Sequence, residues 1–79
     1  MNVENTVVTI LKNVGVQLQD DYMDIDLYES NLIDSLQLMQ LITIMEEKIG
    51  ITIDITEITP DIFKSVRTIT EFVQHKLVQ

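Results

Sequence analysis

The stretch Asn31-Leu32-Ile33-Asp34-Ser35-Leu36 decides how the chain can fold, because a turn-prone acidic segment ends there and a long apolar-rich helical pattern begins. Asp34 or Ser35 is expected to cap this helix, which the pattern extends to about Ile49. Asn31 is expected to form a turn just before it, since asparagine tolerates the left-handed conformation better than most residues. The sequence therefore predicts a helix that starts abruptly after a turn.

The position of Ser35 indicates a chemical role. The first N–H groups of a helix lack intrahelical acceptors, and the helix dipole is positive at that end, so both effects would stabilise a phosphate on a serine there. Ser35 is therefore predicted to be the covalent attachment point of a phosphate-linked prosthetic arm; on spacing alone, an ordinary helix-capping serine is the competing interpretation. No enzymatic activity is expected, because nothing near Ser35 would activate its hydroxyl and the single histidine, His75, lies near the other end of the sequence.

Apolar residues follow Ser35 at helical spacing. They predict a buried stripe made of Leu38, Leu41, Ile42, Met45 and Ile49. Leu36 and Met39 lie outside this stripe and admit two interpretations. They form a soft apolar surface for a partner or a tethered chain, or neighbouring helices of a small bundle bury them as well.

On the N-terminal side, a first helix is predicted over residues 3–14, capped by Asn2 and ended by Gly15. A long acidic connection then runs to Asp34. We expect its apolar residues to hold it against the helices: Val16, Leu18, Tyr22, Met23, Ile25, Leu27 and Leu32. Its carboxylates do not match the spacing of an EF-hand calcium loop, so a solvated loop is expected rather than a metal site.

On the C-terminal side, Ile51–Ile55 alternates like a strand but has no second such run to pair with, so an extended connector with Ile51, Ile53 and Ile55 in the core is expected. Thr59–Phe63 predicts a short helical turn with Pro60 at its first position. The last helix is expected to start at Ser65 or Thr68, where Thr68-x-x-Glu71 fits a capping box. Its predicted core face is Val66, Ile69, Phe72, Val73 and Leu77.

Length and composition predict one domain spanning residues 1–79, and the helical patterns described above make it all-α. The 46% hydrophobic content is enough for a core, and the absence of cysteine excludes disulfides and thiolate metal sites. The formal net charge of −8 argues against a nucleic-acid partner and favours basic protein surfaces. No signal peptide or apolar run of membrane-spanning length is visible, so a cytoplasmic protein is expected. We also expect it to be a monomer.

With these features together, the chain resembles the acyl carrier protein family. The resemblance covers essentially the whole chain and is carried by Leu27-x-Glu29-x-Asn31-Leu32-Ile33-Asp34-Ser35-Leu36, Glu46-Glu47, Gly50-Ile51-x-Ile53, Thr59-Pro60-Asp61-Ile62-Phe63, Ser65-Val66 and Ile69. It implies a four-helix bundle with three main helices, a short third helix and a long acidic loop between the first two.

The resemblance also implies a covalent 4′-phosphopantetheine arm on Ser35, flanked by Asp34 and Leu36. A phosphopantetheinyl transferase would add the arm from coenzyme A, and acyl or aminoacyl groups would then travel as thioesters on its thiol. An adenylating loading enzyme and a downstream transferase or synthase would be the further partners in such a biosynthetic pathway. The residues expected to contact partners are Leu36, Met39, Gln40, Glu46 and Glu47.

The sequence departs from the usual pattern of fatty-acid carriers in two places, and both bear on the pathway in which this protein works. Fatty-acid carriers usually have acidic residues after the serine, where this chain has Gln37 and Gln40, and they place glycine nearer the aspartate, where this chain has Leu32 and Ile33. The pattern is more similar to free-standing carriers of D-alanyl, aminoacyl or secondary-metabolite groups. The alternatives are a housekeeping fatty-acid carrier, an unmodified carrier-like subunit that binds a basic partner, and a small hydrolase or metal-binding domain.

Overall fold

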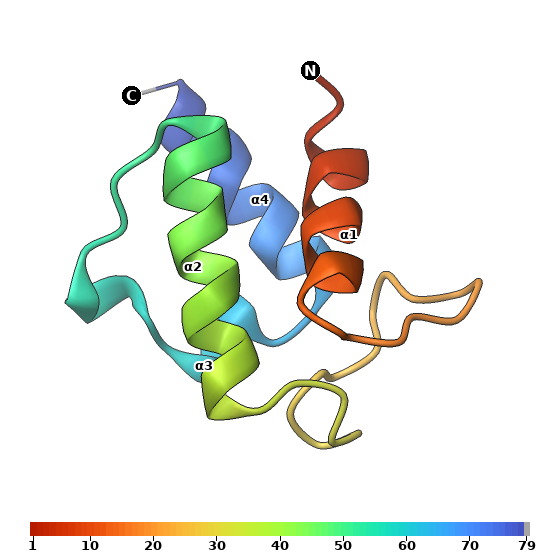
Figure 1. The fold of residues 1–79 in the computed structure, drawn as a ribbon. Helices are drawn as coiled ribbons and strands as arrows, with labels where there is room; N and C mark the ends of the chain where they lie inside the picture. Colours follow the sequence, from red (N-terminus) through yellow and green to blue (C-terminus); the bar gives the residue numbers. More distant parts are fainter. Residues whose placement is uncertain (79) are drawn as a thin grey trace.

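The computed structural model describes residues 1–78, which contain helices and no strand (Figure 1). The elements are α1 (Val3–Asn13), α2 (Ser35–Ile49), a 3₁₀ turn η1 (Ile55–Glu57), α3 (Pro60–Phe63) and α4 (Val66–Leu77). The predicted all-α class, with three main helices and a short third helix, is confirmed. Within residues 1–78, no helix is long and apolar enough to cross a membrane.

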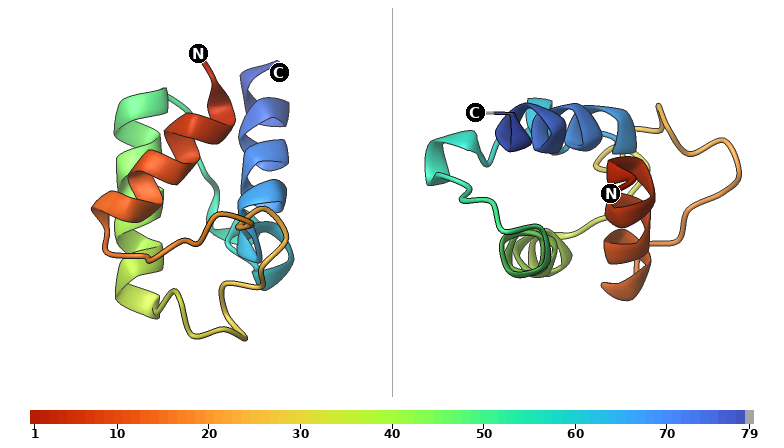
Figure 2. Two further views of the ribbon diagram at one scale, coloured as in Figure 1. Left: turned by 90° about the vertical axis from the view of Figure 1, so that its right-hand side faces the viewer. Right: turned by 90° about the horizontal axis from the view of Figure 1, so that it is seen from above.

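The core lies where the apolar stripes of the helices meet. α1 packs against both α4 and α2, running obliquely between them in the left view of Figure 2, and α3 packs against α4. The fully buried side chains include Val7, Leu11, Leu27, Leu41, Met45, Phe63, Val66, Ile69 and Val73. The prediction that Leu77 belongs to the core face of the last helix is wrong. This residue is the last of α4 and is 44% exposed, because the packed stripe ends before it.

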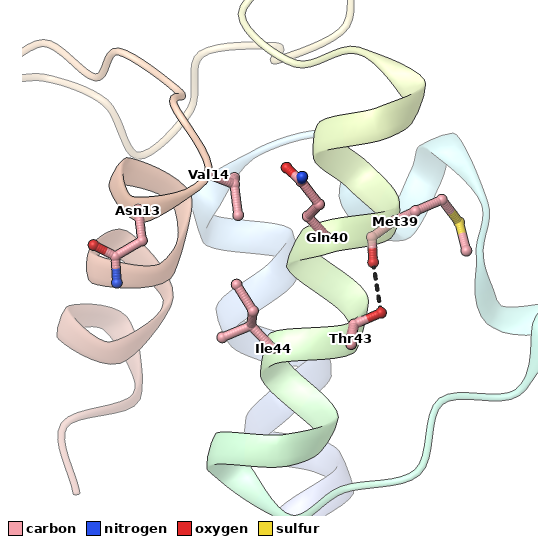
Figure 3. A pocket seen from close by; sticks show the side chains of 6 residues that line it. All are labelled: Asn13, Val14, Met39, Gln40, Thr43 and Ile44. Carbon is pink, nitrogen blue, oxygen red and sulfur yellow. Dashed lines mark hydrogen bonds between the residues drawn. The ribbon is translucent and has the colours of Figure 1, made fainter.

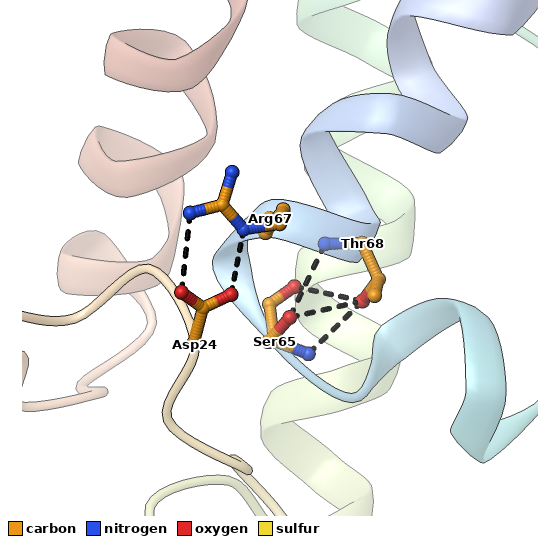
Figure 4. Close-up of polar contacts among 4 residues, drawn as sticks. All are labelled: Asp24, Ser65, Arg67 and Thr68. Carbon is orange, nitrogen blue, oxygen red and sulfur yellow. Dashed lines mark hydrogen bonds and ion pairs between the residues drawn. The ribbon is translucent and has the colours of Figure 1, made fainter.

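The helix starts are fixed by side-chain caps. Asp34, not Ser35, caps α2, and Thr59 caps α3 with Pro60 in its first turn as predicted. The capping box predicted from Thr68 and Glu71 is wrong. Ser65 instead accepts a hydrogen bond from the N–H of Thr68 at 3.2 Å, so α4 begins directly after Ser65 (Figure 4).

The long loop before α2 is fastened to the C-terminal part of the chain. The backbone N–H of Arg67 donates to the carbonyl oxygen of Met23 at 3.0 Å, and the N–H of Leu27 donates to the carbonyl oxygen of Lys64 at 2.7 Å. Arg67 also donates twice to Asp24, at 2.6 and 3.1 Å (Figure 4). Most of the apolar residues predicted to hold the loop do so. Those that are buried or packed against the core are Val16, Leu18, Tyr22, Met23, Leu27 and Leu32.

The turn that ends this loop is formed at Asn31, as the sequence predicts. Asn31 has φ 56° and is the one non-glycine residue with a positive φ among residues 1–78. Gly50 ends α2 in the left-handed conformation, with φ 81°. Both ends of α2 are therefore defined by local backbone geometry that the residue types allow at low cost.

We expect the fold to lose stability in acid. The hydrogen bond from Arg67 lowers the pKa of Asp24 from its usual 3.8, and the hydrogen bond from Lys76 lowers the pKa of Glu57 from its usual 4.5. A carboxyl whose pKa is lower in the folded state stabilises the fold above its unfolded pKa, and this contribution disappears as the pH falls through the folded value. Thermal melts at pH 6 and pH 3 measure the loss.

The control for this prediction is Asp24→Asn. Acid also relieves repulsion among the many carboxylates, so the informative quantity is the difference between variant and wild type. Asp24→Asn should lower the melting temperature at pH 6 and have a smaller effect at pH 3. An equal effect at both pH values would contradict the contribution of this pair.

The connector after α2 departs from the sequence expectation at one residue. Ile51 and Ile53 are buried as predicted, but Ile55 is 82% exposed. The alternation stops because Asp54 accepts a hydrogen bond from the N–H of Thr56 at 2.9 Å and starts the 3₁₀ turn η1. The turn changes the direction in which successive side chains point, so the period of two no longer applies to Ile55.

Candidate functional site

Ser35 is the first residue of α2, and its side chain is exposed. Within residues 1–78, its hydroxyl makes no hydrogen bond with another group of the chain. The other two serines differ: Ser30 lies in the loop, and Ser65 is 4% exposed and occupied in capping α4. Ser35 is therefore the serine that combines an accessible hydroxyl with the start of a long helix.

The backbone around Ser35 suits a phosphate ester. The N–H of Gln37 is bonded to Asp34 at 2.8 Å, whereas those of Ser35 and Leu36 have no acceptor in the described part of the chain. Two free N–H groups thus lie beside the hydroxyl, at the positive end of a 15-residue helix. This is the arrangement in which proteins bind phosphate groups, so the residues present fit a phosphate-linked arm.

Gln37 completes the structure of the site, and sequence reasoning missed this role. Its side-chain oxygen accepts from the N–H of Asp34 at 3.0 Å, and its amide nitrogen donates to the carbonyl oxygen of Val14 at 3.2 Å. The start of α2 is thereby tied to the end of α1. The bond between the Asp34 N–H and the Gln37 side chain could have been predicted, because the spacing Asp34-x-x-Gln37 matches a capping box. The bond to Val14 has no such local signal.

We expect Asp34→Ala to destabilise the protein by about 1 kcal/mol, the usual cost of losing a helix cap. The substitution leaves the N–H of Gln37 without its acceptor, whereas the bond from the Asp34 backbone N–H to the Gln37 side chain can remain. Urea unfolding followed by circular dichroism measures the cost. Asp20→Ala, in the exposed loop, is the matched control and should have little effect; equal costs for the two variants would contradict the capping role.

The exposed face of α2 near Ser35 is apolar and uncharged. Leu36 is 67% exposed and Met39 is 52% exposed, so the interpretation in which neighbouring helices bury them is wrong. No charged side chain occurs between Ser35 and Met45. The predicted soft apolar surface beside Ser35 is therefore present in the structure.

The residues predicted to contact partners lie on different sides of α2. Ser35, Met39 and Glu46 are spaced by four and seven residues, so they share one stripe of the helix. Glu46 is half-buried there, and its carboxylate accepts a hydrogen bond from the N–H of Ile53 at 3.0 Å. Its charge is therefore engaged within the protein, whereas Glu47 is exposed.

Gln40 borders a hollow of about 380 Å³ between α1 and α2, and Asn13, Val14, Met39, Thr43 and Ile44 also line it. Figure 3 shows Gln40 and Ile44 on the side of α2 that faces Asn13 and Val14, whereas the side chain of Met39 points to the opposite side. The hollow thus adjoins the stripe that carries Ser35 at Met39. Among residues 1–78, no group of His, Cys, Asp and Glu side chains could hold a metal ion.

Known proteins resemble this chain over most of its length. The family described as "Phosphopantetheine attachment site" matches residues 5–75. A D-alanyl carrier protein of Enterococcus faecalis is 29% identical over 75 residues, covering 94% of this chain and 96% of the relative. One of Latilactobacillus sakei is 37% identical over 59 residues, covering 72% and 74%. One of Streptococcus pyogenes serotype M1 is 28% identical over 74 residues, covering 94% of each.

Proposed function

Since this chain belongs to the family of phosphopantetheine carrier proteins, we propose that Ser35 is the residue that bears the covalent 4′-phosphopantetheine arm. The arm supplies a terminal thiol on which an acyl group is held as a thioester. The observation that carries the assignment is the exposed Ser35 hydroxyl beside the free N–H groups of Ser35 and Leu36. Asp34 and Leu36 flank the attachment point, and Asp34 holds the first turn in place.

The cargo we propose is D-alanine or a closely related small aminoacyl group. The relatives that match over nearly the whole chain are D-alanyl carrier proteins. The uncharged first turns of α2 agree with this assignment, because they lack the acidic residues typical of fatty-acid carriers. The protein carries the group for other enzymes and performs no chemistry on it.

Three kinds of partner follow from this proposal. A phosphopantetheinyl transferase attaches the arm, an adenylating enzyme loads the cargo, and a downstream transferase accepts it. Coenzyme A and ATP supply these reactions, so we place them in the cytoplasm. Within the chain, Leu36, Met39, Gln40 and Glu47 are available to these partners because their side chains are exposed. We assign Glu46 mainly to holding the connector, through its bond to Ile53.

The test is cargo loading followed by intact-mass measurement. The protein is first converted to its arm-bearing form with coenzyme A and a broad-specificity phosphopantetheinyl transferase. It is then incubated with ATP, an enzyme that adenylates D-alanine, and D-alanine, L-alanine or acetate in parallel. We expect a gain of one D-alanyl group that hydroxylamine removes, as a thioester requires. Attachment of the arm without D-alanyl loading would overturn the cargo and leave the carrier assignment standing.

A further inference from the structure

The side chain of Gln37 joins two segments of the chain that meet beside Ser35. Its oxygen accepts from the backbone N–H of Asp34 at 3.0 Å, and its amide nitrogen donates to the carbonyl oxygen of Val14 at 3.2 Å. The backbone N–H of Gln37 also donates to the Asp34 carboxylate, at 2.8 Å. A capping box needs only the bonds between Asp34 and Gln37, so it does not account for the bond to Val14 at the end of α1.

The end of α1 leaves room for this bridge at Gly15. The φ of Gly15 is 96°, in the left-handed region, and a Cβ added at this position would stand 3.3 Å from the amide nitrogen of Gln37. Glycine adopts this conformation at low cost and leaves free the space beside the Gln37 amide. The backbone after α1 and the Gln37 side chain therefore fit closely against each other.

The bridge holds the residue that precedes Ser35. Backbone bonds hold the long loop as far as Ile33, whose N–H donates to the carbonyl oxygen of Leu27 at 3.2 Å. Asp34 follows, and its N–H donates to the Gln37 side chain. The exposed Ser35 side chain makes no hydrogen bond of its own within residues 1–78. Its orientation therefore depends on the backbone that the bridge holds.

We infer that Gln37 is a positioning residue for attachment of the arm, because its bridge holds Ser35 in the orientation that the phosphopantetheinyl transferase needs. The inference rests on the proposed function. In the transfer, the Ser35 oxygen bonds to the phosphorus of the phosphopantetheine group, and the bond from this phosphorus to the nucleotide part of coenzyme A breaks. The nucleotide leaves with the bridging oxygen, and the hydroxyl proton passes to a base of the transferase. The attacking and leaving oxygens must lie roughly in line, so a shift of the first turn of α2 slows the reaction.

Two substitutions break the bridge in different ways. Gln37→Glu keeps an oxygen that can accept from Asp34, and therefore the capping box, but an ionised carboxylate cannot donate to Val14. Gln37→Met keeps an unbranched side chain of similar length without adding charge, and it removes both bonds. We expect each substitution to lower the kcat of arm attachment roughly tenfold, because misplacing a reacting group slows the chemical step. The KM for this protein should stay near the wild-type value.

The experiment measures the kinetics of arm attachment by intact mass, with coenzyme A and a phosphopantetheinyl transferase. Wild type, both Gln37 variants and Gln17→Glu are compared at a temperature at which circular dichroism shows all four to be folded, so a loss of stability alone does not lower kcat. Gln17→Glu is the matched control, because it makes the same chemical change on an exposed side chain two positions after Gly15 and leaves the bridge intact. It should keep the wild-type kcat and KM.

Three results would contradict the positioning role or the attachment on which it rests. A wild-type kcat in Gln37→Met would overturn the positioning role, even if Gln37→Glu were slow, since the added charge would then be the cause. A raised KM at unchanged kcat would overturn it too, because Gln37 would then contribute to binding of the transferase. Both results leave the attachment at Ser35 standing. A wild type that gains no arm would overturn that attachment, and this inference with it.

Discussion

Ser35→Ala should gain no mass on incubation with coenzyme A and a phosphopantetheinyl transferase, whereas the wild type should gain one phosphopantetheine. The substitution removes the one hydroxyl that lies exposed at the start of α2. It leaves the cap intact, because Asp34 and Gln37 make the capping bonds. We therefore expect the stability to change by no more than about 0.5 kcal/mol, as for an ordinary surface substitution.

Ser30→Ala is the matched control for this experiment. Ser30 is exposed and lies five positions earlier, but in the loop rather than at a helix start. It should be modified like the wild type. If Ser35→Ala still gained the arm, the attachment point would lie elsewhere, and the free N–H groups of α2 would lose their proposed role. Urea unfolding of all three proteins shows whether a missing mass gain reflects chemistry or loss of the fold.

Phe63→Ala should cost about 3–5 kcal/mol of folding free energy, the range for a buried aromatic residue. Phe63 is completely buried and lies 5.8 Å from the ring of Phe72, centre to centre. It is the only fully buried residue of α3, whose four residues are too few to be helical on their own. Domains of this size have a total stability of about 5–15 kcal/mol, so the loss is a large part of the whole.

Chemical unfolding at neutral pH measures this cost, and the melting temperature should fall by on the order of 20 °C. Ile55→Ala is the control, since it truncates an apolar side chain that is 82% exposed in the segment just before α3. It should cost no more than about 0.5 kcal/mol. A cost below about 1 kcal/mol for Phe63→Ala would mean that α3 is not held by this side chain.

The parts of the fold that could be predicted were those with a strong local cause. The first helix, the start of α2 at Asp34 or Ser35 and its end at Gly50 depend on signals within a few residues, so periodicity and residue type were sufficient to place them, although not to choose between the two caps. The same holds for Asn31, whose turn needs only a tolerated positive φ. The candidate site was predictable for this reason: the environment of Ser35 is made almost entirely by the first turn of α2.

The features that were missed depend on contacts between distant segments or on a choice between similar local signals. Ser65 and Thr68 both fit the start of α4, and only the structure shows that Ser65 provides the cap. The exposure of Ile55 depends on a turn that Lys76 of α4 helps to hold. The link from Gln37 to Val14 joins residues 23 positions apart, which no local pattern encodes.

The attachment of the long loop to α4 has a consequence for how the protein is made. The carbonyl of Met23 and the carboxylate of Asp24 find their partner in Arg67, 43 positions after Asp24. α1 likewise packs against α4. During synthesis, the first helix and the loop thus emerge before the segment that completes them, although domains of long chains often fold in order from the N-terminus. We conclude that the native packing is complete only after the ribosome has produced α4, and that the part of α1 that packs against α4 stays uncovered until then.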